Sequence, residues 1–264
     1  MHLKRVIVSL VALPLIYFYI TELPPVCFLL LTAVVSALAQ YEFYAMYKIP
    51  GTMSVLGIAG GAILVCSSYL LPATGAESIR SLIFVAIFVS ISSFRLFAVK
   101  DPAGALKDIA PVITGILYIP TLLLTMWYLR LAGYEWIFLL LLCVWSADTF
   151  AYYIGGNFGR RKLYIGVSPN KTVEGAAGSV VGGILSAVIF GSFLIKGIDI
   201  TLLVLIGAVL GAVTIVGDLV ESMFKRDAGI KDSGHIIPGH GGMLDRIDSI
   251  LFAAPALYLL RMLL

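Results

Sequence analysis

The sequence predicts an all-α, polytopic membrane protein with about nine transmembrane helices. Two observations predict this fold class. The 264 residues are 60% hydrophobic and only 12% charged, with a mean hydropathy of +1.03, whereas a soluble domain carries about 25% charged residues. The apolar residues also gather in runs of about 20, the length that a helix needs to cross about 30 Å of hydrocarbon. The surplus of apolar side chains is therefore expected to face lipid.

The first apolar run, residues 5–21, follows Lys4 and Arg5, so it could be a secretory signal peptide or a membrane helix. A signal peptide ends at a cleavage site of small residues, and no convincing small-x-small pattern follows this run. The pair Pro24-Pro25 instead has the composition of a loop. We expect the run to remain as the first membrane helix.

Eight further apolar runs follow, separated by polar or Pro-containing segments. The nine predicted spans cover residues 5–21, 24–41, 53–71, 79–98, 110–130, 134–154, 174–195, 201–220 and 247–264. The first and last are short enough to be tilted or partly interfacial. In the seventh span, Gly182, Gly183 and their small neighbours are expected to permit close helix packing.

The Lys and Arg residues fall unequally on the two sides of a nine-span chain. Fourteen of the 18 lie on the side of the N-terminus. The other four are Arg80, Arg130, Lys196 and Arg261. Cytoplasmic loops carry the excess of positive residues. We therefore expect the N-terminus and the two long charged loops, at about 155–173 and 221–246, in the cytoplasm, and the C-terminus outside.

Composition also excludes some functions. The net charge of +3 does not indicate the dense basic face that nucleic-acid binding usually needs. The three cysteines, Cys27, Cys66 and Cys143, lie inside apolar runs and show no paired spacing. They predict neither a disulfide framework nor a zinc site.

An acidic pattern with the spacing i, i+3, i+4 occurs twice near the last two spans. The two sets are Asp218, Glu221 and Ser222, and Asp245, Asp248 and Ser249. On a helix each set shares one face. Carboxylates at a membrane need partners, and Mg²⁺ binds one or two carboxylates together with phosphate oxygens and water. We predict that Asp218 and Asp245 bind metal, with Asp248 and Glu221 as further ligands or outer partners.

Basic and Gly-rich residues surround these carboxylates. Arg grips phosphate through two parallel bonds and Lys acts as a point charge, while a Gly-rich turn lets a ligand approach backbone N–H groups. The predicted phosphate contacts here are Lys225, Arg226, Lys231, His240, Gly241, Gly242 and Arg246. His235 and His240 do not have a zinc spacing, so we expect His240 to bind phosphate or orient the turn.

The other charged loop follows Asp148, which lies within an apolar span. Such a residue is a functional candidate by default, here as a metal ligand, although it could instead bond a neighbouring helix. The loop ends just before the helix predicted at 174–195, and the N–H groups of a helix start favour anions. The predicted phosphate contacts are Ser168, Asn170, Lys171 and Thr172. Glu42 and Arg95 also lie near the ends of spans, without an identifiable partner.

The segment from Ser222 to Asp248 resembles the signature of the phosphatidate cytidylyltransferases, also called CDP-diacylglycerol synthases. It reads Ser222-x-Phe224-Lys225-Arg226, then Lys231-Asp232-x-Gly234, then Ile237-Pro238-x-His240-Gly241-Gly242-Met243-x-Asp245-Arg246-Ile247-Asp248. No residue departs from that pattern. Residues 148–175 are similar to the family's second basic region, and the resemblance before them is only general.

The resemblance implies a membrane nucleotidyltransferase that converts CTP and phosphatidic acid to CDP-diacylglycerol and pyrophosphate. It implies Mg²⁺, a metal centre that can include K⁺, and a homodimer. The choice of CTP rests on the resemblance, because nothing in the spacing indicates cytosine. We expect residues 1–130 to form a scaffold for dimerisation and lipid access, and residues 131–264 the catalytic domain. The expected catalytic residues are Asp218, Asp245, Lys171 and Arg246.

Other functions fit parts of the pattern. A CTP-dependent polyprenol or phytol kinase would transfer the γ-phosphate and release CDP. An ion-coupled transporter would also place Asp148 in a span, but its acidic residues should line a path at the midplane, whereas most here cluster at one surface. The Asp-Gly…Ala-Arg pattern of a CDP-alcohol phosphotransferase is absent.

Overall fold

The computed structural model describes residues 14–71, 77–234 and 241–263, which are helical apart from one β-hairpin and short connections. Residues 14–21 are helical. The further elements are α2 (Pro25–Met46), α3 (Gly51–Leu70), α4 (Glu77–Val99), α5 (Ala105–Ile116), the π-helical turn η1 (Leu117–Thr121), α6 (Leu122–Ala132), α7 (Tyr134–Phe158), β1 (Lys162–Tyr164), β2 (Ser168–Thr172), α8 (Val173–Leu194), α9 (Ile200–Asp227) and α10 (Leu244–Met262).

Seven segments within the described residues are long and apolar enough to cross a membrane. They match the second to eighth predicted spans. One of them, Ala105–Ala132, is a continuous rod made of α5, η1 and α6. Pro111 and Pro120 lie inside it. Since proline has no N–H and clashes with the preceding turn, Pro120 accounts for the local change to a π turn. The fold is thus that of a multi-pass, helical membrane protein.

The structure does not confirm the first and last predicted spans in the way that it confirms the other seven. Most of the predicted span 5–21 lies outside the described residues. The ninth prediction corresponds to α10, which is 19 residues long and carries Asp245, Arg246, Asp248 and Arg261. So many charges set α10 apart from the seven apolar spans, because a charged side chain in hydrocarbon is costly. The total of nine spans therefore stays a prediction.

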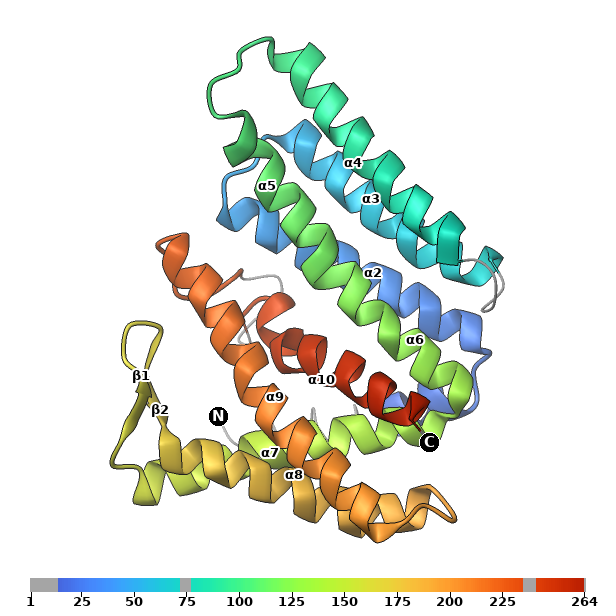
Figure 1. The fold of residues 1–264 in the computed structure, drawn as a ribbon, viewed down its shortest axis with the longest axis vertical. Coiled ribbons are helices and arrows are strands. Elements are labelled where there is room, and N and C mark those ends of the chain that lie inside the picture. The colour runs from blue at the N-terminus through green and yellow to red at the C-terminus, as the bar shows by residue number, and fades with distance from the viewer. Residues whose placement is uncertain (1–13, 72–76, 235–240, 264) are drawn as a thin grey trace.

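The helix connections alternate between two sides of the molecule (Figure 1). The α2–α3 and α4–α5 connections, the hairpin and the end of α9 lie on one side. The α6–α7 and α8–α9 connections and the end of α10 lie on the other. The described loops therefore separate as the Lys and Arg distribution requires.

Helix α10 packs in the two larger of the three hydrophobic clusters among the described residues. Its residues Leu244 and Leu251 are buried in a core built mainly from α2 to α6. Further along, Ala254 and Leu257 are buried in a second core, which includes α7 and α9. Because α10 belongs to both cores, the carboxylates at its start are held by packing from both halves of the chain.

Small residues let α8 pack closely between α7 and α9, as its glycines predicted. A Cβ at Gly182 would lie 2.7 Å from the carbonyl oxygen of Ser146 on α7. A Cβ at Gly211 on α9 would lie 2.5 Å from the carbonyl oxygen of Ser179 on α8. The Ser179 hydroxyl also donates to the Gly211 carbonyl oxygen at 2.8 Å.

The charged loop at about 155–173 contains a two-stranded antiparallel hairpin, which the all-α prediction missed. Strand β1 pairs with β2, and β2 leads directly into α8. Strands of three and five residues are too short to show the alternating pattern from which strands are predicted. Pro169 is tolerated in β2 because each strand of a two-stranded sheet is an edge.

Candidate active site

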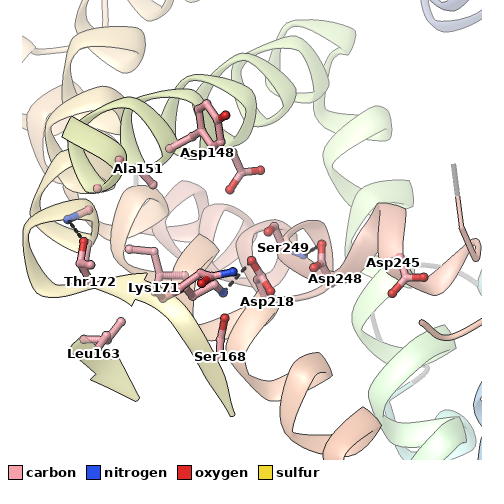
Figure 2. A pocket seen from close by; sticks show the side chains of 17 residues that line it. Asp148, Ala151, Leu163, Ser168, Lys171, Thr172, Asp218, Asp245, Asp248 and Ser249 are labelled. Atoms are coloured by element: carbon pink, nitrogen blue, oxygen red, sulfur yellow. Dashed lines mark hydrogen bonds and ion pairs between the residues drawn. The ribbon is translucent and has the colours of Figure 1, made fainter. Parts of the chain in front are cut away.

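A cavity of about 750 Å³ lies where the hairpin meets α7, α8, α9 and α10. This volume is in the range of about 300–1,000 Å³ that is usual for small-molecule sites. Its polar side chains are those of Tyr152, Asp148, Ser168, Asn170, Lys171, Thr172, Asp218, Asp245, Asp248 and Ser249. Figure 2 shows that the four Asp side chains of this lining project from three helices, and that Lys171 projects from β2. The cavity thus unites the two charged loops, which are far apart in sequence.

The ion pair between Lys171 and Asp218 joins the hairpin to α9 (Figure 2). The Nζ of Lys171 lies 2.6 Å from Oδ2 of Asp218, and the two side chains are 23% and 35% exposed. The other oxygen of Asp218 accepts a hydrogen bond from the Ser222 hydroxyl, one helical turn further on, at 3.3 Å. Both members of the pair can therefore be reached from the cavity.

Asp148 approaches the same cavity from α7. The neighbouring residue Ala147 is buried, whereas Asp148 is exposed and lines the cavity. Within the described part of the chain, Asp148 makes no hydrogen bond or ion pair, so the alternative of a bond to a neighbouring helix is not observed there. An acidic group left open to a cavity is available to a ligand.

Asp245 is the centre of a hydrogen-bonded network at the start of α10. Its Oδ1 lies 2.7 Å from Nζ of Lys225, which also lies 2.5 Å from Oε2 of Glu221. Its Oδ2 accepts bonds from the Ser233 N–H (3.2 Å), the Ser233 hydroxyl (2.9 Å) and the Gly242 N–H (3.0 Å). Asp245 therefore both borders the cavity and organises the loop that precedes α10.

The donor set of the cavity fits Mg²⁺. All four acidic side chains of the lining offer oxygen atoms, the ligands that Mg²⁺ prefers. No group of three or more His, Cys, Asp or Glu among the described residues is arranged to hold a metal by itself. Mg²⁺ needs only one or two protein carboxylates when phosphate and water complete its shell, and the lining offers at least that number of carboxylates.

Several predicted site residues lie beside the cavity rather than in its lining. Glu221 is fully buried and faces Lys225. Arg226 donates to the carbonyl oxygens of Val167 (3.3 Å) and Ile230 (3.2 Å), so it ties α9 to the hairpin. The remaining basic side chains, Lys231 and Arg246, are exposed.

The Gly-rich turn is described only in part. Gly241 has a φ of +82°, a left-handed conformation that glycine adopts without strain. The Gly242 N–H is used by Asp245. His235 and His240 lie outside the described residues, so the expected contact of His240 with phosphate stays a prediction.

The start of α8 is already capped by its own chain. Thr172 is the N-cap, and its hydroxyl accepts a hydrogen bond from the Gly175 N–H at 3.1 Å. Glu174 in the first turn accepts from the backbone N–H groups of Arg160 (3.0 Å) and Arg161 (3.2 Å). One of the amides that we expected to attract an anion is thus occupied. The lining residues Asn170 and Lys171 remain at the cavity instead.

The two residues without an identifiable partner in the sequence both have one in the fold. Arg95 pairs with Asp108 and donates to the carbonyl oxygens of Asp101 (2.8 Å) and Ala103 (2.9 Å), which fixes the α4–α5 connection. Glu42 contacts the start of α10. The available signal was a lone charge at the end of an apolar span, which shows that a partner exists but not where it lies.

Comparison with known proteins identifies the family. The sequence model described as "Cytidylyltransferase family" matches residues 3–264. The phosphatidate cytidylyltransferase of Staphylococcus haemolyticus is 32% identical over 98% of this chain and 96% of its own length. That of Staphylococcus epidermidis is 34% identical with the same coverage, and that of Bacillus subtilis is 48% identical over 48% of each chain. With its charged loops joined in one cavity, and with the family model and the two staphylococcal relatives matching nearly end to end, the chain belongs to the phosphatidate cytidylyltransferase family.

Proposed function

We propose that this protein forms CDP-diacylglycerol and pyrophosphate from CTP and phosphatidic acid in the cavity beside the hairpin. The family and its relatives support the reaction. The observation that carries the location is the pairing of Lys171 with Asp218 inside a cavity that Asp148 and Asp248 also line. A cation for phosphate and carboxylates for a metal are thus available within one site.

The transfer needs no nucleophilic side chain. An oxygen of the lipid phosphate attacks the α-phosphorus of CTP, the bond between the α-phosphorus and the bridging oxygen to the β-phosphorus breaks, and pyrophosphate leaves. The lipid phosphate is already an anion, so the protein contributes positioning and charge neutralisation. Lys171 exchanges Asp218 for the triphosphate, while Ser168, Asn170 and Thr172 border the same position. Arg226, Lys231 and Arg246 add positive charge at the rim.

The carboxylates would hold Mg²⁺. Asp218, Asp245 and Asp248 are the proposed ligands, with Asp148 facing them from α7. When bound, Mg²⁺ would supply positive charge that neutralises the charge developing on the phosphate oxygens. Glu221 would support the metal ligands indirectly, because its ion pair with Lys225 helps to orient that lysine against Asp245.

The membrane arrangement follows from the same geometry. The hairpin and the end of α9 lie on one side of the molecule (Figure 1), and both segments are rich in Lys and Arg. Residues of the hairpin line the cavity. We place this side in the cytoplasm, so the lipid enters from the inner leaflet. Residues 1–130 would serve as the scaffold of a homodimer, and residues 131–264 would carry the chemistry.

Product analysis tests the reaction. The purified protein in detergent is given Mg²⁺, labelled CTP and phosphatidic acid, and labelled lipid and pyrophosphate are measured together. We expect both products in equal amounts and their loss with EDTA. Asp218→Asn should lower turnover about 100-fold or more, whereas Asp199→Asn, at the opposite end of α9, should leave it unchanged because Asn caps a helix as well as Asp does.

Other outcomes point to other functions. CDP without pyrophosphate would indicate a lipid kinase. No turnover by folded protein, across several lipid phosphates and with K⁺ present, would contradict the proposal and favour a transporter. Unchanged turnover in Asp218→Asn would remove the metal role of that residue.

A further inference from the structure

Glu42, near the end of α2, is a buried carboxylate that reaches the start of α10. Its side chain is enclosed, since the residue is 2% exposed. Its Oε1 accepts a hydrogen bond from the Met243 N–H at 2.9 Å, and its Oε2 accepts one from the Leu244 N–H at 2.8 Å. The first N–H groups of a helix have no partner within the helix, and Met243 supplies no side-chain cap. Glu42 therefore caps α10 from another helix.

The same carboxylate contacts the loop that carries the family signature. The Ser233 hydroxyl lies 3.3 Å from Oε2 of Glu42 and 2.9 Å from Oδ2 of Asp245. One hydroxyl has a single proton to donate, and the shorter contact assigns it to Asp245. Ser233 nevertheless touches both carboxylates. Glu42 and Asp245 thus hold one short segment from two sides.

Two signature glycines have no side chain where the Glu42 carboxylate lies. A Cβ at Gly234 would lie 2.7 Å from Oε1 of Glu42. A Cβ at Gly242 would lie 2.1 Å from the Ser233 hydroxyl oxygen and 2.6 Å from Oε2 of Glu42. Real Cβ atoms do not approach other atoms so closely, so any larger residue would displace the carboxylate or the loop. Gly234 is therefore explained by a residue outside the signature, and Gly242 by that residue together with Ser233.

The charge of Glu42 is accommodated by the helix that it caps. A helix N-terminus carries a partial positive charge that stabilises a carboxylate. In return, the direction and register of the first turn of α10 depend on Glu42, because both of its oxygens bind consecutive amides of that turn. Asp245 lies in that first turn, and Asp248 lies three residues further along the helix.

We propose that Glu42 is a positioning residue for nucleotidyl transfer. It sets the first turn of α10 and the adjoining signature loop so that Asp245 and Asp248 face the cavity. The inference rests on the proposed function of that cavity. The proposal also gives a function to the N-terminal helices, because α2 contributes the carboxylate that caps the start of α10.

Hydrogen exchange tests the positioning without any turnover. In Glu42→Gln, which has the same shape, the amide nitrogen of the new side chain would face one of the two N–H groups. We expect the amides of residues 243–246 to exchange roughly 10-fold faster in the metal-free protein, the factor that corresponds to losing one charged hydrogen bond. Peptides from α3 should be unchanged. The matched control is Glu135→Gln. Glu135 lies in the first turn of α7, away from α10's first turn, so exchange at residues 243–246 should be the same as in the wild type.

Turnover gives the second measurement. Glu42→Gln should raise the Mg²⁺ concentration for half-maximal rate by about 10–100-fold, as for other residues that orient metal ligands, and excess Mg²⁺ should recover part of the rate. A residue that only stabilised the fold would lower the amount of active protein and leave the Mg²⁺ dependence alone. Unchanged exchange at residues 243–246 together with an unchanged Mg²⁺ dependence would overturn the proposal.

Gly234→Ala covers the case in which Glu42→Gln does not fold, because the three atoms nearest to a Cβ at that position all belong to Glu42. Its methyl group would intrude on Glu42, so we expect the same rise in exchange and in Mg²⁺ requirement. In the double variant with Glu42→Ala, the two effects should be less than additive, because the methyl group then enters vacated space. Full additivity would contradict the inference. If the wild type made no CDP-diacylglycerol, the proposed function would fail, whereas the exchange experiment would still decide whether Glu42 holds α10.

Discussion

Lys171 of the hairpin and Asp218 of α9 lie 2.6 Å apart across the cavity, where each satisfies the charge of the other. A bound polyphosphate would compete with Asp218 for Lys171. The carboxylate released in this way would be open to a cation, so the nucleotide and its metal are expected to enter together. On the proposed function, the ion pair would be the state of the site before its substrate binds.

Removing the Lys171 charge should stop the reaction. We expect Lys171→Met to lower kcat/KM for CTP about 100-fold or more, since a charge aimed at the reacting phosphates is lost. Lys171→Arg should keep part of the activity, because its charge remains while its geometry differs. Steady-state kinetics measure both, with Lys196→Met on the opposite side as the control. Rates within twofold of the wild type in Lys171→Met would contradict this role.

Lys225 should matter for stability. Its side chain is 13% exposed and lies between Glu221, which is fully buried, and Asp245. Lys225→Met would leave a buried carboxylate without its cation, at a cost of about 3–5 kcal/mol, so the melting temperature in detergent should fall. Adding Glu221→Gln should recover part of the loss by removing one of the stranded charges. An unchanged melting temperature in Lys225→Met would show that the network is not a stabilising one.

The close contact of α8 with α9 should not tolerate a methyl group. A Cβ at Gly207 would lie 2.5 Å from Cα of Ile184, so Gly207→Ala forces the helices apart. We expect a loss of about 1–3 kcal/mol in stability, seen as a lower melting temperature. Gly51→Ala is the matched control, because a Cβ there would meet nothing within 4 Å. Equal melting temperatures for the two variants would argue against tight packing.

Membrane orientation can be measured by cysteine labelling. In a background where Cys27, Cys66 and Cys143 are replaced, single cysteines are placed at the exposed positions Lys162 and Lys196. An impermeant reagent added to intact cells should label the residue at position 196 and spare that at 162. Labelling at 162 would become possible only after the cells are opened. The reverse result would invert the orientation inferred from the positive residues.

Some features could be read from the sequence because they are local properties of the chain. A run of apolar residues identifies a span wherever it occurs, and the described helices agree with the second to eighth predicted spans. The alternation of Lys and Arg, the glycines of α8 and the signature from Ser222 to Asp248 are local in the same sense. Their spacing was enough to predict the fold class and the family.

The hairpin and the detailed pairing within the site required the tertiary structure. Neither Lys171 with Asp218 nor Glu42 with the start of α10 is indicated by any periodicity, because the partners lie on different elements and meet only after the helices have packed. The sequence alone identified the seven described segments that are apolar and long enough to cross a membrane, and it identified the residues that are candidates for chemistry. Only the tertiary structure decided which of those residues meet, since a salt bridge or a helix cap depends on distances of a few ångströms that are set by the packing of α10 between two cores.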